Sequence, residues 1–257
     1  SFAYTPEAVG DGQVARDIAL TGLKGGHSGI DIILGLGNAN KLMARFLRTA
    51  IREFGVRIVT INAGTARNAI PRESFATVVL PSDKADDFDA AVARFGAEVK
   101  DEIGTIEPNF AIAAKDADLP KAAMSAGDSK RFNNAVTGAP NGVHAMSTSV
   151  EGVVETSINL AIVKLADGKA NVTLSARSSI NSARDAIRET ATAVFENIGA
   201  TVTWGDAYPG WKPNADSEVV NMMKAVHRDM FGKDPEIRVI HAGLECGVLG
   251  SKYPHWD

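Results

Sequence analysis

The sequence has one cysteine, Cys246, among its 257 residues, so no disulfide can form within the chain. It also lacks any apolar run near the roughly 18 residues that a membrane-spanning helix requires. Its first residues show no basic segment followed by an apolar one, so we expect no signal peptide. These absences favour a protein of the reducing cytoplasm.

A strong charge of either sign is missing as well. The formal net charge is −4 at pH 7, and the sequence pI is near 5.8. There is therefore no electrostatic reason to expect nucleic acid as a partner. The hydrophobic fraction of 45% and the charged fraction of 23% are those of an ordinary globular protein.

The two ends of the chain carry a further prediction. The chain has no initiator methionine, and it stops at the sequence YPHWD, residues 253–257. Natural C-termini often trail off in polar residues. We therefore expect this chain to be a piece of a longer polypeptide.

Apolar residues recur every three or four positions in four stretches, which predicts amphipathic helices. Each stretch is followed by a glycine, the residue that most often ends a helix. Ser82 is expected to cap the second helix, and a shorter helix is expected over residues 125–136. The four stretches are 38–54, 82–103, 182–198 and 216–231.

Strand patterns lie between the helices, and Asp167-Gly168 separates two of them in the way that is typical of a tight hairpin. The order predicts an α+β fold, with two ferredoxin-like βαββαβ units forming one antiparallel sheet and helices on one face. A Pro/Gly-rich break at 208–213 separates a final α-β piece that is too small to fold alone. The expected strands are 13–23, 56–63, 74–80, 154–165, 169–178, 200–205 and 236–242.

The first candidate for chemistry is the loop Gly25-Gly26-His27-Ser28-Gly29. Glycines around a histidine let the backbone turn sharply and leave the imidazole exposed. Such a histidine can donate a hydrogen bond to a developing oxyanion. The alternative is a tight turn in which His27 only caps or packs.

Two polar residues on other segments are further candidates. Asn68 stands on a turn that Pro71 fixes between two strands, although an ordinary polar loop would have the same pattern. Arg177 lies within an expected strand, where a guanidinium needs a partner. That partner could be a substrate carboxylate or a structural carboxylate of the protein.

The segment from His241 to Gly247 follows an expected strand. His241 and Glu245 are four residues apart, which on a helix would suit a metal. Because Gly243 and the preceding strand favour a loop, we expect substrate contact here and no metal ligation. Cys246 is expected to be a buried bystander and not a nucleophile.

Taken together, these segments resemble the di-zinc aminoacyl-histidine dipeptidases, a family also called peptidase D or cytosol non-specific dipeptidase and related to carnosinase. They occur in the family's order over nearly the whole chain. The matching segments are 20–29 (LTGLKGGHSG), 37–42 (GNANKL), 68–73 (NAIPRE), 152–157 (GVVETS), 208–211 (YPGW) and 241–247 (HAGLECG).

The resemblance implies a subunit with two domains: a catalytic domain with two zinc ions, and an inserted lid domain that covers the substrate and forms a homodimer. Residues 1–206 would be the lid, and residues 207–257 part of the catalytic domain. The resemblance places the family's zinc-binding motifs, a His-x-Asp and a Glu-Glu pair, in segments outside this chain. The sequence has no Glu-Glu pair, and its two His-x-Asp tripeptides, 227–229 and 255–257, lie outside the segments that match the family. The chain alone is therefore expected to lack the metal ligands and to be inactive.

The resemblance also implies roles in dipeptide hydrolysis. His27 would stabilise the oxyanion in the partner subunit's site, Asn68 would hydrogen-bond the substrate, and Arg177 would hold its terminal carboxylate. Gly243 and Glu245 would line the pocket from the catalytic side. Two alternatives remain: a non-catalytic module that dimerises or binds peptides, and the lid of a related aminoacylase-type amidohydrolase.

Overall fold

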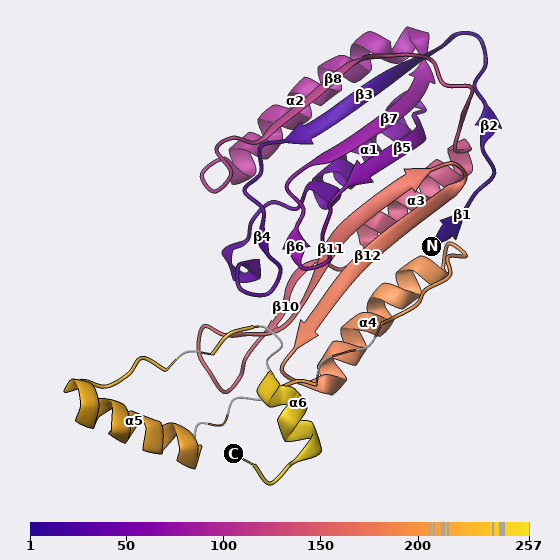
Figure 1. The fold of residues 1–257 in the computed structure, drawn as a ribbon. Coiled ribbons are helices and arrows are strands. Elements are labelled where there is room, and N and C mark those ends of the chain that lie inside the picture. Colours follow the sequence, from indigo (N-terminus) through magenta and orange to yellow (C-terminus); the bar gives the residue numbers. More distant parts are fainter. Residues whose placement is uncertain are drawn as a thin grey trace.

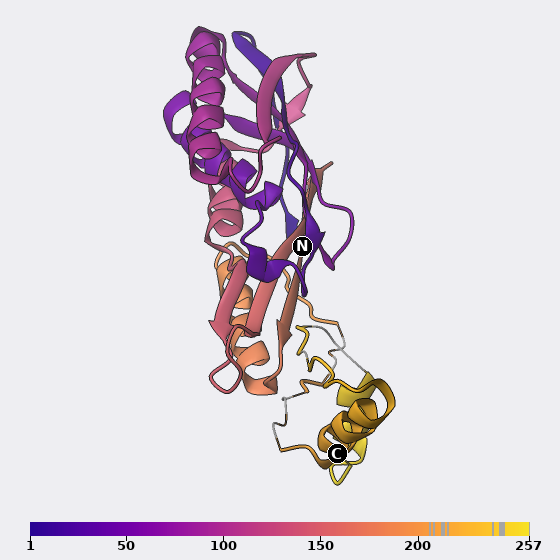
Figure 2. The same cartoon turned by 90° about the vertical axis from the view of Figure 1, so that its left-hand side faces the viewer.

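A computed structural model describes residues 1–205, 207, 209–211, 214, 216–237, 239–241 and 245–256 (Figure 1). No helix in these ranges is long and apolar enough to cross a membrane. The structure is built on one large antiparallel sheet with helices against one of its faces (Figures 1 and 2). This arrangement confirms the predicted fold class.

The sheet has the strand order β1-β12-β11-β5-β7-β3-β8, and β10 pairs with one end of β11. The long strand β11 joins the two halves, since it pairs with β12 along its length and with β5 near its C-terminal end. The strands are β1 (Phe2–Ala3), β3 (Gln13–Thr21), β5 (Arg57–Ala63), β7 (Ser74–Pro81), β8 (Ala111–Ala117), β10 (Gly142–Met146), β11 (Val154–Ala166) and β12 (Lys169–Ser178).

The first half is a ferredoxin-like unit in which β3, α1, β5, β7, α2 and β8 follow one another along the chain. Helix α1 (Ala39–Phe54) begins at Asn38, whose side chain accepts hydrogen bonds from two backbone N–H groups. Helix α2 (Ala85–Ile103) starts three residues after the expected cap, because Ser82 begins the short 3-10 helix η2 (Ser82–Lys84).

The second half contains α3 (Ala126–Gly138), the strands β10 to β12, and α4 (Asn181–Glu196). The predicted hairpin between β11 and β12 is confirmed: Asp167 and Gly168 both have positive φ, 50° and 80°. Two positive φ values in a two-residue loop match the right-handed twist of the strands.

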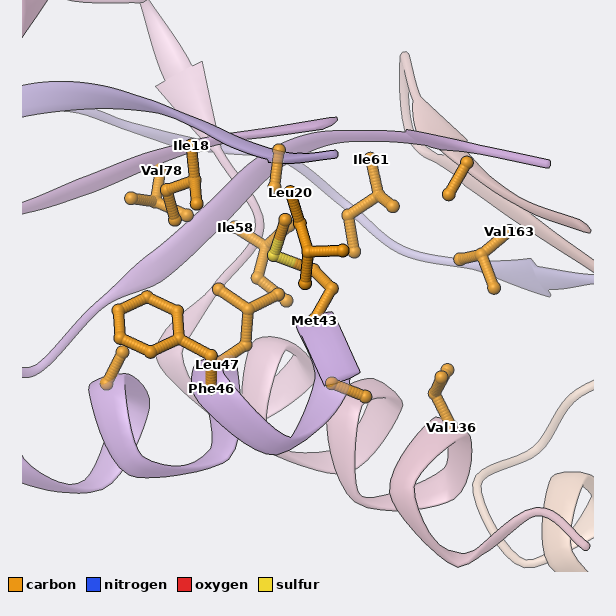
Figure 3. Close-up of a cluster of buried hydrophobic side chains, with 14 of the residues drawn as sticks. Ile18, Leu20, Met43, Phe46, Leu47, Ile58, Ile61, Val78, Val136 and Val163 are labelled. Carbon is orange, nitrogen blue, oxygen red and sulfur yellow. The ribbon is translucent and has the colours of Figure 1, made fainter. Parts of the chain in front are cut away.

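The main core lies between the sheet and the helices (Figure 3). Ile18, Ile58 and Val78 project from neighbouring strands toward Phe46 and Leu47 of α1, and all five side chains are at most 1% exposed. The apolar stripe of α1 therefore covers the sheet as its period of three to four residues predicted. Burial of this kind contributes about 25 cal/mol per Å² of apolar surface.

Two expected strands are wrong. Residues 200–205 form no strand, although Thr201 exchanges two backbone hydrogen bonds with Ser1 at the sheet edge. The described residues of 236–242 form none either. The C-terminal piece contributes two helices, α5 (Glu218–Phe231) and α6 (Glu245–Lys252), within the described part of the chain.

Several short elements complete the fold. The pair β4 and β6 and the 3-10 helix η1 lie on the loops that carry the candidate site residues (Figure 1). A second small pair, β2 and β9, lies apart from them. The bounds are β2 (Glu7–Ala8), β4 (Gly26–His27), η1 (Ile32–Leu34), β6 (Ala69–Ile70) and β9 (Ala122–Ala123).

Candidate substrate-binding site

The glycine-rich loop of His27 is held against the loop of Asn68. Strands β4 and β6 pair here, with His27 opposite Ala69. The backbone N–H of Ser28 donates to the carbonyl of Asn68 at 2.8 Å, and that of His27 donates to Asp31 Oδ2 at 2.7 Å. Two residues 41 positions apart in the sequence are thereby brought to one place.

The His27 ring is oriented by its own loop. Its Nδ1 atom accepts hydrogen bonds from the backbone N–H groups of Gly29 and Ile30, at 3.2 and 3.1 Å. A ring nitrogen that accepts carries no proton, so the ring proton is on Nε2. The loop therefore presents Nε2–H as a donor, which is the atom that an oxyanion needs.

Arg177 projects from β12, opposite Ser157 of β11. Its side chain is half-buried, and its Nε atom is buried with no hydrogen-bond partner. Burial lowers the pKa of the guanidinium below its usual range, and the charge of the nearby Arg67 lowers it further. Since an arginine stays charged in proteins, this group requires an anion.

His241 approaches the same place from the C-terminal piece. Its Nε2 atom lies 2.8 Å from Ser157 Oγ and forms a hydrogen bond with it. Burial lowers the pKa of His241 to about 4, and the charge of Arg177 acts in the same direction. The imidazole is therefore neutral at pH 7.

Gly29 explains how closely the two segments approach. A Cβ atom at this position would lie 2.3 Å from the carbonyl oxygen of His241, closer than any real contact. Only glycine lets the His27 loop contact the His241 segment. The sequence predicts substrate contact for the segment that begins at His241, but it assigns no role to His241 itself.

A cavity of about 430 Å³ joins these groups, a size that suits a small ligand. Asn68, Arg177 and His241 line it, whereas His27 and Glu245 do not. Glu245 is exposed at the first residue of α6, and Gly243 lies outside the described residues. The charged and aromatic side chains of its wall are Arg67, Arg177, Arg184, Arg188, Trp204, Trp211 and His241.

The charges of the cavity wall are of one sign. Four arginines line it, and none of the described lining residues is Asp or Glu. Arg184 and Arg188 both contact Asp185, and Arg188 lies over the ring of Trp204 at 4.7 Å. Asp185 offsets only one of the four positive charges, so the wall keeps an excess of positive charge, which favours an anionic ligand.

The residues of this site do not form a metal centre. In the part of the chain that the structure describes, no three His, Cys, Asp or Glu side chains come together in a way that could hold a metal ion. His241 and Glu245 do not share a helix, because α6 begins at Glu245. Zinc therefore does not fit this donor set.

Comparison with known proteins defines the class first. Residues 18–106, which run from within β3 through α1, β5, β7 and α2, match the peptidase dimerisation domain. Over 98% of its length the chain is also 39% identical to cytosol non-specific dipeptidase of Escherichia coli (strain K12). The crystal structure of aminoacylhistidine dipeptidase from Vibrio alginolyticus is 41% identical over 98% of this chain and superposes with a TM-score of 0.94.

These matches confirm the resemblance that the motifs indicated: the chain is a homologue of the aminoacyl-histidine, or cytosol non-specific, dipeptidases. The chain spans 52% of the length of each of these two relatives. Their names describe proteins about twice as long. The activity of a whole protein containing this chain is therefore a matter for proposal.

Proposed function

We propose that this chain is the substrate-binding lid, with an adjoining part of the catalytic domain, of a cytoplasmic dipeptidase that hydrolyses Xaa-His and other short peptides. The observation that carries the proposal is the cavity at Arg177, a positively charged pocket with a partnerless buried guanidinium nitrogen. Relatives over nearly all of this chain are dipeptidases by name, which supports this choice over a non-catalytic module or the lid of an aminoacylase.

Arg177 binds the C-terminal carboxylate of the substrate. A guanidinium can bind a carboxylate through two parallel hydrogen bonds, and burial strengthens such a pair. The free C-terminal carboxylate of a peptide would neutralise Arg177 and relieve its repulsion from Arg67. Because that carboxylate is tied to one end of the cavity, only peptides a few residues long would place a peptide bond near it.

His27 and Asn68 act on the rest of the peptide. Nε2–H of His27 donates to the carbonyl oxygen as negative charge develops there, and the Asn68 side chain hydrogen-bonds the peptide backbone. His27 lies beside the cavity of its own chain and not in its wall, which supports a role in the site of a second copy. Gly243 and Glu245 remain predicted pocket residues.

The zinc ions that the family resemblance implies would supply an activated water when bound. Their ligands would come from outside this chain. The roles proposed for His27, Asn68 and Arg177 are therefore binding and stabilisation of charge. By itself the chain is not expected to hydrolyse peptides.

The proposal is tested by His27→Ala in a full-length enzyme that contains this chain. Loss of the oxyanion donor should lower kcat by about 10²–10³-fold, as for other lost donors of this kind. His144→Ala is the matched control, since His144 is exposed on β10 away from the cavity wall. Near-normal turnover of His27→Ala with normal metal content would refute the role of His27.

A further inference from the structure

A fully buried carboxylate lies beneath the His27 loop, and it belongs to no element of the proposed site. Glu107 is 0% exposed and follows α2, 80 residues after His27. Its Oε2 accepts a hydrogen bond from the backbone N–H of Lys24 at 2.8 Å, and its Oε1 accepts one from that of Gly37 at 2.9 Å. Both oxygens are thus used on backbone donors.

The two donors lie at opposite ends of one loop. Lys24 follows β3 and precedes His27 by three residues, whereas Gly37 comes directly before Asn38, the residue that caps α1. A single carboxylate therefore closes the segment 24–37 at its base. It also lies at the positive end of the α1 dipole, where a negative charge is favoured.

The residues around Glu107 hold its two hydrogen bonds in place. A Cβ on Gly37 would lie 2.7 Å from Leu23 Cδ2, and one on Gly22 would lie 1.8 Å from the carbonyl oxygen of Asn109. The backbone of Glu107 is itself held, since its N–H donates to the carbonyl of Ile103 at 2.7 Å. The turn after α2 is thus packed against both ends of the His27 loop.

Contacts within the loop pass this constraint on to the imidazole. Asp31 accepts from the His27 backbone, and the N–H groups of Gly29 and Ile30 hold Nδ1. These three bonds require the compact loop that closure at its base provides. An opened loop would lose the donors at Nδ1 and with them the fixed tautomer.

We propose that Glu107 is a positioning residue: by binding the two ends of the loop 24–37, it keeps Nε2–H of His27 as the outward donor. The positioning of the ring by Glu107 does not depend on any function of His27. Its consequence for catalysis rests on the function proposed for His27.

The first experiment observes the ring directly by ¹⁵N NMR of this chain. The native chain should show the Nε2–H tautomer, with couplings across the hydrogen bonds from Gly29 N and Ile30 N to His27 Nδ1. In Glu107→Gln the amide group must place an NH₂ against one of the two backbone N–H donors. Those couplings should vanish and the ring should populate both tautomers.

A matched control separates positioning from stability. Asn133 is 2% exposed and donates to the carbonyl of Ala44 on the other side of α1, so Asn133→Ala removes a buried polar contact away from the loop. It should lower the free energy of unfolding and keep the His27 couplings. If Glu107→Gln does not fold, Glu107→Asp keeps the charge but is too short to reach both donors, and it should lose the same couplings. Unchanged His27 couplings in a folded Glu107 variant would overturn the proposal.

The second experiment is a double-mutant cycle in the full-length enzyme. Glu107→Gln should lower kcat by about 10- to 100-fold with little change in KM, because an ångström-scale misplacement of a catalytic group has effects of that order. Combined with His27→Ala it should cause no further loss. Independent, multiplicative losses would refute action through His27. If His27→Ala alone has no effect, the proposed function of His27 fails, while the NMR result still decides the positioning.

Discussion

Arg177 and His241 show how burial prepares a pair of basic groups for a ligand. Both have a pKa below the usual range, mainly because both are partly removed from water. The His241 imidazole therefore stays neutral at pH 7, whereas the Arg177 guanidinium cannot lose its proton near that pH. Of this pair, Arg177 alone stays charged, next to a cavity whose described wall has no carboxylate.

The lowered pKa of His241 predicts a pH dependence of stability. The folded value of about 4 lies below the ordinary 6.5, so the unfolded chain binds more protons between these values. The free energy of unfolding should therefore fall as the pH drops from about 6.5 toward 4. His241→Gln should flatten this part of the profile in urea titrations, and His144→Gln should leave it unchanged. An NMR titration of the His241 ring with a midpoint near 6.5 would contradict this account.

The sequence predicted which residues are candidates for the site, but not how they are buried or which groups they contact. Glycines around His27 and the Pro71 turn near Asn68 are visible in the sequence, because unusual backbone needs unusual residues. The contact of His241 with Ser157 joins segments 84 residues apart, and the charge that lowers the pKa of Arg177 is that of Arg67, 110 residues away. No local pattern encodes such distances.

Among the elements, the loop between β3 and α1 is tightly constrained at its start. Gly22, at its start, has φ of +79°, and the carbonyl of Asn109 occupies the space that a Cβ would need. Gly22→Ala should therefore destabilise the chain by more than the about 1–2 kcal/mol of a left-handed backbone alone. Gly10→Ala is the control, because a Cβ there meets nothing within 4 Å. Chemical denaturation measures both, and equal effects would contradict the packing described.

The helices were predictable because their apolar stripes and glycine stops are local signals, and α1 follows them closely. Strand β8 was missed because it lies at the sheet edge, where none of its residues is fully buried, and because its alanines have little strand preference. The predicted strand 200–205 has the apolar pattern. The backbone of Thr201 bonds Ser1 and that of Ala200 bonds Phe195 of α4, but these bonds do not form a ladder with a neighbouring strand. Strand pairing, unlike a helix, depends on residues elsewhere in the chain.

At the scale of the whole molecule, the proposed use of His27 in a second copy predicts a homodimer. Ile30, Ile33 and Leu34 lie within the loop 24–37, close to His27 in the sequence, and are 45–57% exposed, so a partner that receives His27 would cover them. Light scattering should give twice the chain mass of 27.1 kDa. Ile33→Glu should shift it toward a single copy, and Val219→Glu on α5, also exposed, should not. A monomeric native chain would contradict the prediction.

The grip of Arg177 on a free carboxylate is the centre of the account, and one comparison tests it most directly. In a full-length enzyme, kcat/KM is measured for an Xaa-His dipeptide and for its C-terminal amide, in the native protein and in Arg177→Met. Arg57→Met is the control, because Arg57 is also largely buried but bonds the backbone carbonyls of Glu7 and Met124. The native enzyme and Arg57→Met should prefer the free acid by about 10- to 100-fold, the worth of a charged hydrogen-bonded pair. Arg177→Met should lose that preference, because its kcat/KM should fall for the dipeptide and stay unchanged for the amide. If Arg177→Met still prefers the free acid as strongly as the native enzyme does, the account is contradicted.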